Sequence, residues 1–230
     1  MLTRKTLLIF LFFISGTIMI LSNGFGQSAS DSSGIVTDID SNAYNTVNIG
    51  TQVWMVENLK TSLYNDGTSI PQVITIESWI NLSTAGYCWY KNDTSYKATY
   101  GALYNWSAVN SGKLCPGGWH VPTDADWTRL TNFLGGESTA GDKLKDFVRN
   151  IWIDPNDGAN NESGFTALPG GDRSPNGSFS GAGFYGTWWS STENGSFDAW
   201  YRLLYSTSSI AFRYDHVKRA GFSVRCLQNY

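Results

Sequence analysis

Two segments near the C-terminus alternate large apolar or aromatic residues with small or polar residues at a period of two. They are residues 199–206 (AWYRLLYS) and 210–217 (IAFRYDHV), and the polar triplet Thr207-Ser208-Ser209 separates them. Side chains of a β-strand point alternately to opposite faces, so the pattern predicts two antiparallel strands joined by a turn. This pattern constrains the fold more than any other feature because it fixes which residues share a face.

The predicted hairpin has one face suited to a core and one suited to binding. Trp200 and Leu204 belong to the first face, and large rings usually fill cores. The opposite face is rich in tyrosine, whose amphipathic ring gives a large contact area at a small cost in entropy. We therefore predict a ligand-binding surface that consists of Asn194, Phe197, Asp198, Tyr201, Leu203, Tyr205, Phe212, Tyr214, Asp215 and His216.

Within this surface, three tyrosines are the expected stacking anchors (Tyr201, Tyr205 and Tyr214). Asp198, Asp215 and His216 are the expected polar contacts. The alternative interpretation is that the rings cover a second buried layer, and we prefer that alternative for Trp188, Trp189 and Trp200.

The rest of the pattern predicts an α+β fold with two helices, twisted antiparallel strands and much irregular loop. Residues 36–48 are predicted to form an N-terminal hairpin, and residues 221–227 a final strand. Thr123 and Asp126 fit a variant capping box at the start of one helix. A second helix is predicted over residues 139–149. The side chains expected to face the core are Trp127, Leu130 and Leu134 on the first helix, and Leu144, Phe147 and Val148 on the second.

Composition limits the function classes. The chain has 10 tryptophans, 12 tyrosines and 12 phenylalanines, enough to fill a sizeable core, which excludes a disordered tail or a coiled coil. The formal net charge of −3 gives no basic field, so no nucleic-acid partner is expected. We find no linker after residue 35, and residues 36–230 are predicted to form a single domain.

Residues 1–26 have the layout of a secretory signal peptide. The apolar run over residues 7–21 covers about 22 Å as a helix, which is short of the roughly 30 Å of a bilayer core. We expect cleavage, a flexible polar lead-in over residues 27–35, and export to the bacterial envelope or the medium. The alternative is an uncleaved anchor, and only then would a membrane be a partner.

The three cysteines are Cys88, Cys115 and Cys226. Export favours one disulfide and one remaining thiol, and the residues alone leave open which two cysteines pair. His120 and His216 are the only histidines and there is no C-x-x-C pair, so a zinc site is not expected.

We recognise no arrangement of catalytic residues in the sequence, and we expect no catalytic residues. His120 lies within an apparent core strand, and Asp124 and Asp126 suit helix capping better than glycoside cleavage. No cofactor is expected either. A weak candidate for a Ca²⁺ loop is the oxygen-rich run that contains Asp154, Asn156, Asp157 and Glu162; the alternative is a solvated loop.

Several long motifs occur in order along the chain: IGTQVWMVENLKT, YNDGTSIP, YGALYNW, LCPGGWHVPTDADW, NESGFTALPGG, GTWWSSTE and GFSVRCL. The chain thereby resembles the Fibrobacter succinogenes major paralogous domain family of exported bacterial proteins. The resemblance implies a C-type-lectin-like fold over about residues 101–230, shared with formylglycine-generating enzymes. It implies that Trp119-His120-Val121 pairs with Ser223-Val224-Arg225. It also implies a Cys115–Cys226 disulfide, with Cys88 as the spare thiol.

The same resemblance adds to the functional hypothesis. Lectin-type domains include targets of diversity-generating retroelements, which rewrite surface codons, and residues 194–216 have the matching mixture of residue types. We predict an exported, non-catalytic binding module whose hairpin face contacts a glycan, a cell-wall component or a protein. The alternatives are a structural envelope protein and a degenerate oxidase of the formylglycine-generating type.

Overall fold

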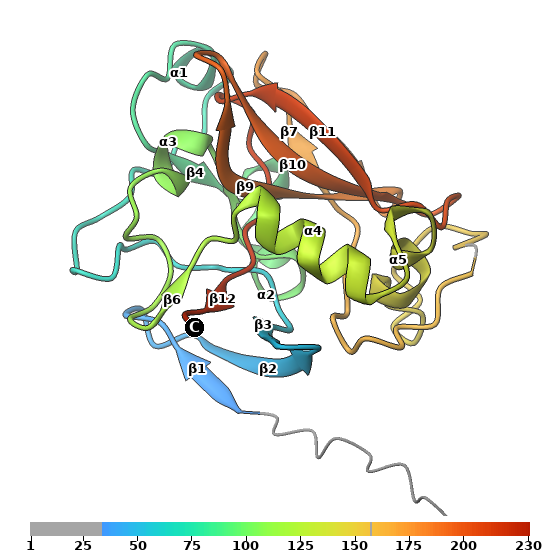
Figure 1. Cartoon of the computed structure of the whole chain (residues 1–230). Coiled ribbons are helices and arrows are strands. Elements are labelled where there is room, and N and C mark those ends of the chain that lie inside the picture. The colour runs from blue at the N-terminus through green and yellow to red at the C-terminus, as the bar shows by residue number, and fades with distance from the viewer. Residues whose placement is uncertain (1–33, 157) are drawn as a thin grey trace, which may run out of the picture. The chain divides into compact units, whose positions relative to one another are not determined.

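The computed structural model describes residues 34–156 and 158–230 (Figure 1). The predicted signal peptide over residues 1–26, and the predicted lead-in as far as residue 33, lie outside the described residues. The described residues belong to one compact unit. No helix within them is both long and apolar enough to cross a membrane.

The first sheet joins the two ends of the described chain. Its strand order is β1-β2-β3-β12-β6. β1 (Ile35–Thr37) and β2 (Ala43–Ile49) form the predicted N-terminal hairpin, and β3 (Gln52–Met55) pairs antiparallel with β2. β12 (Leu227–Gln228) lies between β3 and β6 (Trp119–His120), which places the last strand beside one of the first (Figure 1).

The second sheet contains the predicted C-terminal hairpin. Its order is β11-β10-β9-β7-β8, in which β7 runs parallel to β9 and every other pair is antiparallel. The strands are β7 (Gly170–Arg173), β8 (Phe179–Ala182), β9 (Tyr185–Asn194), β10 (Asp198–Tyr205) and β11 (Phe212–Val217). The hairpin is therefore confirmed, within two residues at each end.

Helix α4 (Asp124–Phe133) begins at the predicted cap. The Thr123 hydroxyl accepts the backbone N–H of Asp126 (3.2 Å), and the Asp126 carboxylate accepts the backbone N–H of Thr123 (2.9 Å). This reciprocal pair satisfies two donors that a helix start leaves free. The three side chains predicted to face the core, Trp127, Leu130 and Leu134, are buried.

The second predicted helix is shorter than expected. α5 (Glu137–Leu144) ends because Lys145 adopts an extended backbone, and the following residue donates its N–H to the carbonyl of Ala167 (3.0 Å). The prediction that Phe147 and Val148 face the core is wrong, because they lie beyond the helix and are 54% and 75% exposed. The Lys145 ammonium group explains the break, since it is buried and donates to backbone carbonyls beside the β10–β11 turn.

Further short elements complete the α+β fold. They are α1 (Ile76–Ile80), β4 (Tyr87–Cys88), η1 (Tyr90–Asn92), η2 (Thr94–Tyr96), α2 (Lys97–Tyr100), β5 (Leu103–Tyr104) and α3 (Trp106–Val109). β4 and β5 form a two-stranded sheet of their own.

The predicted final strand is wrong in extent, and its predicted pairing is wrong in register. Only Leu227–Gln228 is a regular strand, and it pairs with His120 and Trp119. The residues before it have other backbone partners: Trp189 donates to Ser223 (3.1 Å), Leu59 to Val224 (2.8 Å) and Met55 to Cys226 (3.1 Å). Because these groups are already satisfied, β6 meets only the last two residues of the segment.

The core is built largely from aromatic rings. Trp54 contacts Trp127 (4.9 Å between ring centroids) and Phe165 (5.6 Å). Trp188 and Trp189 on β9 are buried, as expected. Edge-to-face and tilted arrangements of this kind are the favoured ones for aromatic pairs.

Buried cationic side chains hold the irregular segments to this core. Arg173 is fully buried and donates to the carbonyls of Val73 (2.5 Å), Ile74 (3.2 Å) and Thr75 (3.1 Å). Arg225 is fully buried too; it donates to Asn58 and stacks over the Phe165 ring at 4.0 Å. Burial lowers the pKa of Arg225 to about 9. The two guanidinium groups thus donate hydrogen bonds to loop carbonyls.

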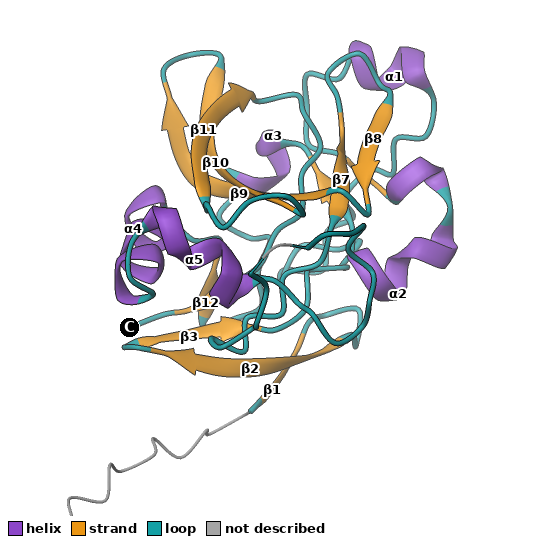
Figure 2. Ribbon diagram, turned by 90° about the vertical axis from the view of Figure 1, so that its right-hand side faces the viewer, coloured by secondary structure: helices purple, strands orange, loops and turns teal. Residues whose placement is uncertain are grey.

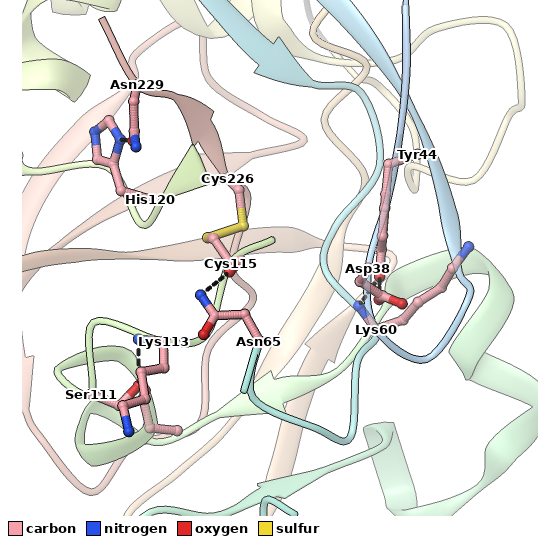
Figure 3. Close-up of a disulfide and its surroundings, with 11 residues drawn as sticks. Asp38, Tyr44, Lys60, Asn65, Ser111, Lys113, Cys115, His120, Cys226 and Asn229 are labelled. Carbon is pink, nitrogen blue, oxygen red and sulfur yellow. Dashed lines mark hydrogen bonds between the residues drawn. A yellow bond between two sulfur atoms is a disulfide. The ribbon is translucent and has the colours of Figure 1, made fainter. Parts of the chain in front are cut away.

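The predicted disulfide between Cys115 and Cys226 is confirmed, and it links residues 111 positions apart (Figure 3). Asn65 donates its side-chain amide to the carbonyl of Cys115 (3.0 Å), which fixes the loop beside the bond. Cys88 is the free cysteine, and burial raises the pKa of its thiol to about 12.

We predict that the Cys115→Ala/Cys226→Ala double variant is less stable than the wild type by about 4 kcal/mol, because the cross-link restricts a long loop of the unfolded chain. Urea unfolding of the two proteins measures the difference. Cys88→Ala is the matched control, and it keeps the cross-link. Equal stability of the double variant and the wild type would contradict the prediction.

Candidate functional site

One face of the second sheet gathers aromatic side chains from three neighbouring strands. Tyr201 on β10 lies opposite Tyr214 on β11, and Leu203 lies opposite Phe212. On the other side of β10, Tyr205 lies opposite Tyr185 on β9. Residues in register on neighbouring strands share a face, so these side chains lie together. We call this surface the aromatic face; its members are Phe184, Tyr185, Tyr201, Leu203, Tyr205, Phe212, Tyr214 and His216.

The rings of the aromatic face touch one another in a continuous row. Tyr214 stacks on Phe212 with centroids 5.6 Å apart, and Phe212 meets Tyr205 edge-on at 5.7 Å. Tyr205 in turn contacts Phe184 (5.8 Å) and Tyr185 (5.7 Å). Mutual packing restricts each ring to a narrow range of orientations, so the surface is preformed.

Exposure differs along the row. Tyr214 is 46% exposed and Phe184 is 40% exposed, whereas Leu203 is buried. Tyr201 is half-buried, because its ring also packs on Phe222 at 4.7 Å. Burial raises the pKa of the Tyr201 hydroxyl, which stays protonated and able to donate at neutral pH. The exposed contact area therefore centres on Tyr214 rather than on Tyr201.

The opposite face of the hairpin is fixed to helix α4 by one carboxylate. Asp124 accepts Nη1 of Arg202 at 2.7 Å, and Nε and Nη2 of Arg213 at 3.0 and 2.9 Å. Burial alone would raise the pKa of Asp124, but the hydrogen bonds from the two arginines outweigh it and lower the pKa. Figure 2 shows α4 beside β9 and β10, where this contact lies. We call the three side chains the arginine clamp.

The clamp explains the position of Trp200, which the sequence predicts to lie in the core. Trp200 is half-buried, and the Arg213 guanidinium lies 3.6 Å from its ring centroid. Asp215 pairs with Trp200 in the β10–β11 register, so it lies on the clamp side of the hairpin rather than among the tyrosines.

The remaining predicted site residues lie at the open end of the hairpin. Asn194 is exposed, and it pairs with Asp198 at the β9–β10 turn. Phe197 in that turn is 78% exposed and makes no ring contact with the aromatics of the described residues. His216 packs against Tyr201 at 6.2 Å, and its Nδ1 accepts the backbone N–H of Val217 (2.8 Å). The structure thus joins His216 to the aromatic face and separates Phe197 from it.

A polar group at the edge of the aromatic face was missed by sequence reasoning. Asp172 on β7 accepts the hydroxyls of Tyr185 (3.0 Å) and Ser180 (3.1 Å). Burial raises the pKa of Asp172, and these hydrogen bonds only partly offset the effect. The run Tyr185 to Trp189 is the sequence signal for this group, but no strand is predicted there. The run is part of β9, and the pairing of β9 with β7 brings Asp172 beside the hairpin.

Two side chains of the oxygen-rich loop proposed for Ca²⁺ contact groups outside the run. Asn156 donates its amide to the carbonyl of Asp146 (3.0 Å), and Glu162 faces the Lys143 ammonium at 3.4 Å. Asp157 lies outside the described residues, and Asp154 precedes a cis proline. Residues 34–156 and 158–230 contain no group of three or more His, Cys, Asp or Glu that could hold a metal ion.

The carboxylates considered for catalysis have structural partners. The Asp126 carboxylate caps α4 and accepts a hydrogen bond from the Tyr230 hydroxyl (2.9 Å). The His120 Nε2 lies 3.4 Å from this carboxylate, which raises the pKa of His120, while Nδ1 faces Asn229 (Figure 3). Both imidazole nitrogens are therefore engaged.

We predict that Asp124→Ala is less stable than the wild type by about 3 kcal/mol, because the substitution leaves the buried Arg202 guanidinium without its counter-charge. Urea unfolding measures the loss. Glu162→Ala serves as the control, since it removes an ion pair between Lys143 and an exposed carboxylate and should leave stability nearly unchanged. A stability loss no larger than that of the control would show that the clamp does not hold the hairpin.

We predict that Asp172→Asn gains stability relative to the wild type as pH rises. The pKa of Asp172 is raised in the folded state, so the folded chain binds more protons than the unfolded chain between the ordinary pKa and the folded one. The wild type therefore loses stability as pH rises through the folded pKa, and the asparagine variant does not. Urea unfolding between pH 4 and 8 tests this; a difference between the two proteins that does not change with pH would contradict it.

Comparison with known proteins gave one match. The family model described as the Fibrobacter succinogenes major domain matches residues 47–228. Searches of the curated proteins and of the solved structures found no match. The matched range runs from β2 to the last strand and includes the clamp and the whole aromatic face. The chain belongs to the Fibrobacter succinogenes major domain family.

Proposed function

We propose that this protein is an exported, non-catalytic binding module and that the aromatic face is its binding surface. The observation that carries the proposal is the row of mutually packed rings on one sheet face, with Tyr214 and Phe184 exposed. Rigid aromatic rings suit both sugar rings and protein hot spots, because they bury a large area without a loss of side-chain freedom.

The polar edge of the face supports a ligand that carries hydroxyl or amide groups. Asp172 offers a carboxyl group already oriented by Tyr185 and Ser180. A ring platform bordered by such a directional group can stack one part of a ligand and hydrogen-bond another. We therefore propose a glycan or cell-wall saccharide as the first candidate ligand and a protein as the second.

We propose that residues 101–230 adopt a C-type-lectin-like arrangement. In support, β6 and β12 pair near the two ends of this range, and the Cys115–Cys226 disulfide joins the same ends. An experimentally determined structure tests this by superposition on lectin-type domains. A different strand connectivity would remove the resemblance without affecting the aromatic face.

Export is supported by the disulfide, which forms in oxidising compartments, and by the predicted leader. Fractionation of a bacterium that produces the full chain, with mass spectrometry of its N-terminus, tests it. A cytoplasmic product that begins at residue 1 would contradict export.

The binding proposal predicts that Tyr214→Ala weakens ligand binding by at least about tenfold, the usual loss at an aromatic hot spot. Glycan and protein arrays probed with the full chain identify the ligand, and titration compares the variants. Phe147→Ala is the matched control, because Phe147 is an exposed aromatic residue that lies off the face.

Equal binding by Tyr214→Ala and the wild type would contradict the assignment of the face. Self-association that depends on protein concentration and is lost in Tyr214→Ala would instead indicate the structural envelope role.

A further inference from the structure

A hollow lies at the open end of the hairpin, outside the aromatic face. Its volume is about 420 Å³, and the turn before β10, the end of β11 and the segment after α1 all contribute to its wall. A volume of this size falls in the range of small-ligand pockets, about 300–1,000 Å³. The residues that define its chemistry are Ser83, Ser107, Ser196, Phe197 and Arg219.

Arg219 supplies an uncompensated positive charge to this hollow. Its guanidinium is exposed and donates from Nη1 to the carbonyl of Ile80 (2.5 Å), its one hydrogen-bond partner in the described part of the chain. No carboxylate belongs to the wall of the hollow among the described residues. The remaining N–H donors of Arg219 are therefore available, and a guanidinium offers them in a fork that matches a carboxylate.

The neighbouring cation, Lys218, is a structural contact and does not compete for an anion. Its ammonium group is paired with Glu193 (2.9 Å) and donates to the carbonyls of Gly195 (3.0 Å) and Ser196 (3.1 Å). Its backbone N–H also donates to the carbonyl of Phe197 (2.9 Å). These bonds fix the turn that carries Phe197, so the exposed ring stands on a rigid backbone.

Phe197 and three serines add an aromatic ring and hydroxyl groups to the hollow. The Phe197 ring is 78% exposed and is not used for packing, which is unusual for a phenylalanine. The hydroxyls of Ser83, Ser107 and Ser196 have no hydrogen-bond partner in residues 34–156 and 158–230. A ring that can stack, hydroxyl groups that can donate or accept, and a free guanidinium together fit a sugar that carries a carboxylate.

We propose that this hollow binds the carboxylate of a sugar acid, with Arg219 pairing the carboxylate and Phe197 stacking on the sugar ring. The site does not depend on the aromatic face, and either assignment can fail without the other.

Titration of the full chain with D-glucuronate, followed by NMR shifts of backbone amides, tests the proposal; D-glucose is the neutral probe. We expect shifts at residues 196–197 and 217–219 with glucuronate, and binding of glucose weaker by at least about tenfold, because the charged hydrogen bond is missing. Arg219→Gln and Phe197→Ala should each weaken glucuronate binding by at least about tenfold. Phe147→Ala should leave it unchanged, because Phe147 is an exposed aromatic residue outside the hollow.

Arg149→Gln is the matched control, because it removes an exposed arginine charge that does not belong to the hollow. No shifts with glucuronate, or shifts that persist in Arg219→Gln, would overturn the proposal. Equal binding of glucose and glucuronate would overturn it as well, since the guanidinium would then have no role in recognition.

Discussion

One carboxylate joins both strands of the C-terminal hairpin to helix α4. Asp124, the first residue of α4, accepts hydrogen bonds from Arg202 and Arg213, which project from the same face of β10 and β11. An unpaired arginine is costly to bury, so this face must meet the helix. Because the side chains of a strand alternate, the tyrosines are then turned to the other side. The aromatic face is therefore a consequence of the clamp as much as of the tyrosines.

The rest of the chain is held by the same kind of contact. Long stretches between the sheets have no regular secondary structure, and their carbonyls still require donors. Arg173, Arg225 and Lys145 are buried and supply those donors to segments that are distant in sequence. The chain thus combines an aromatic core with cationic side chains that connect its loops, and the disulfide between Cys115 and Cys226 adds a covalent link.

The sequence predicted those parts of the fold that depend on local periodicity. The β10–β11 hairpin, the β1–β2 hairpin and the capping box at Thr123 follow from alternation or from spacing within a few residues. The wrong parts depend on distant partners. α5 ends early because Lys145 reaches carbonyls near β11, and the last strand is short because its backbone groups are already paired.

The candidate site was predictable to the same degree. Alternation placed Tyr201, Tyr205 and Tyr214 on one face, but it could not show how deeply each ring lies. Asp172 and Phe184 come from strands and turns whose neighbours in space are set by the β7–β9 pairing, which leaves no trace in local spacing. Phe197 was grouped with the tyrosines because it is close in sequence, whereas the turn carries it to a separate hollow.

Hydroxyl-radical footprinting of the full chain, with and without the ligand identified on the arrays, tests most directly whether the aromatic face is the binding surface. We predict that Tyr214, Phe212 and Phe184 lose reactivity when the ligand binds, while the exposed Phe147 keeps its reactivity. Protection confined to residues outside the aromatic face, with Tyr214 unchanged, would contradict the claim that this face is the binding surface.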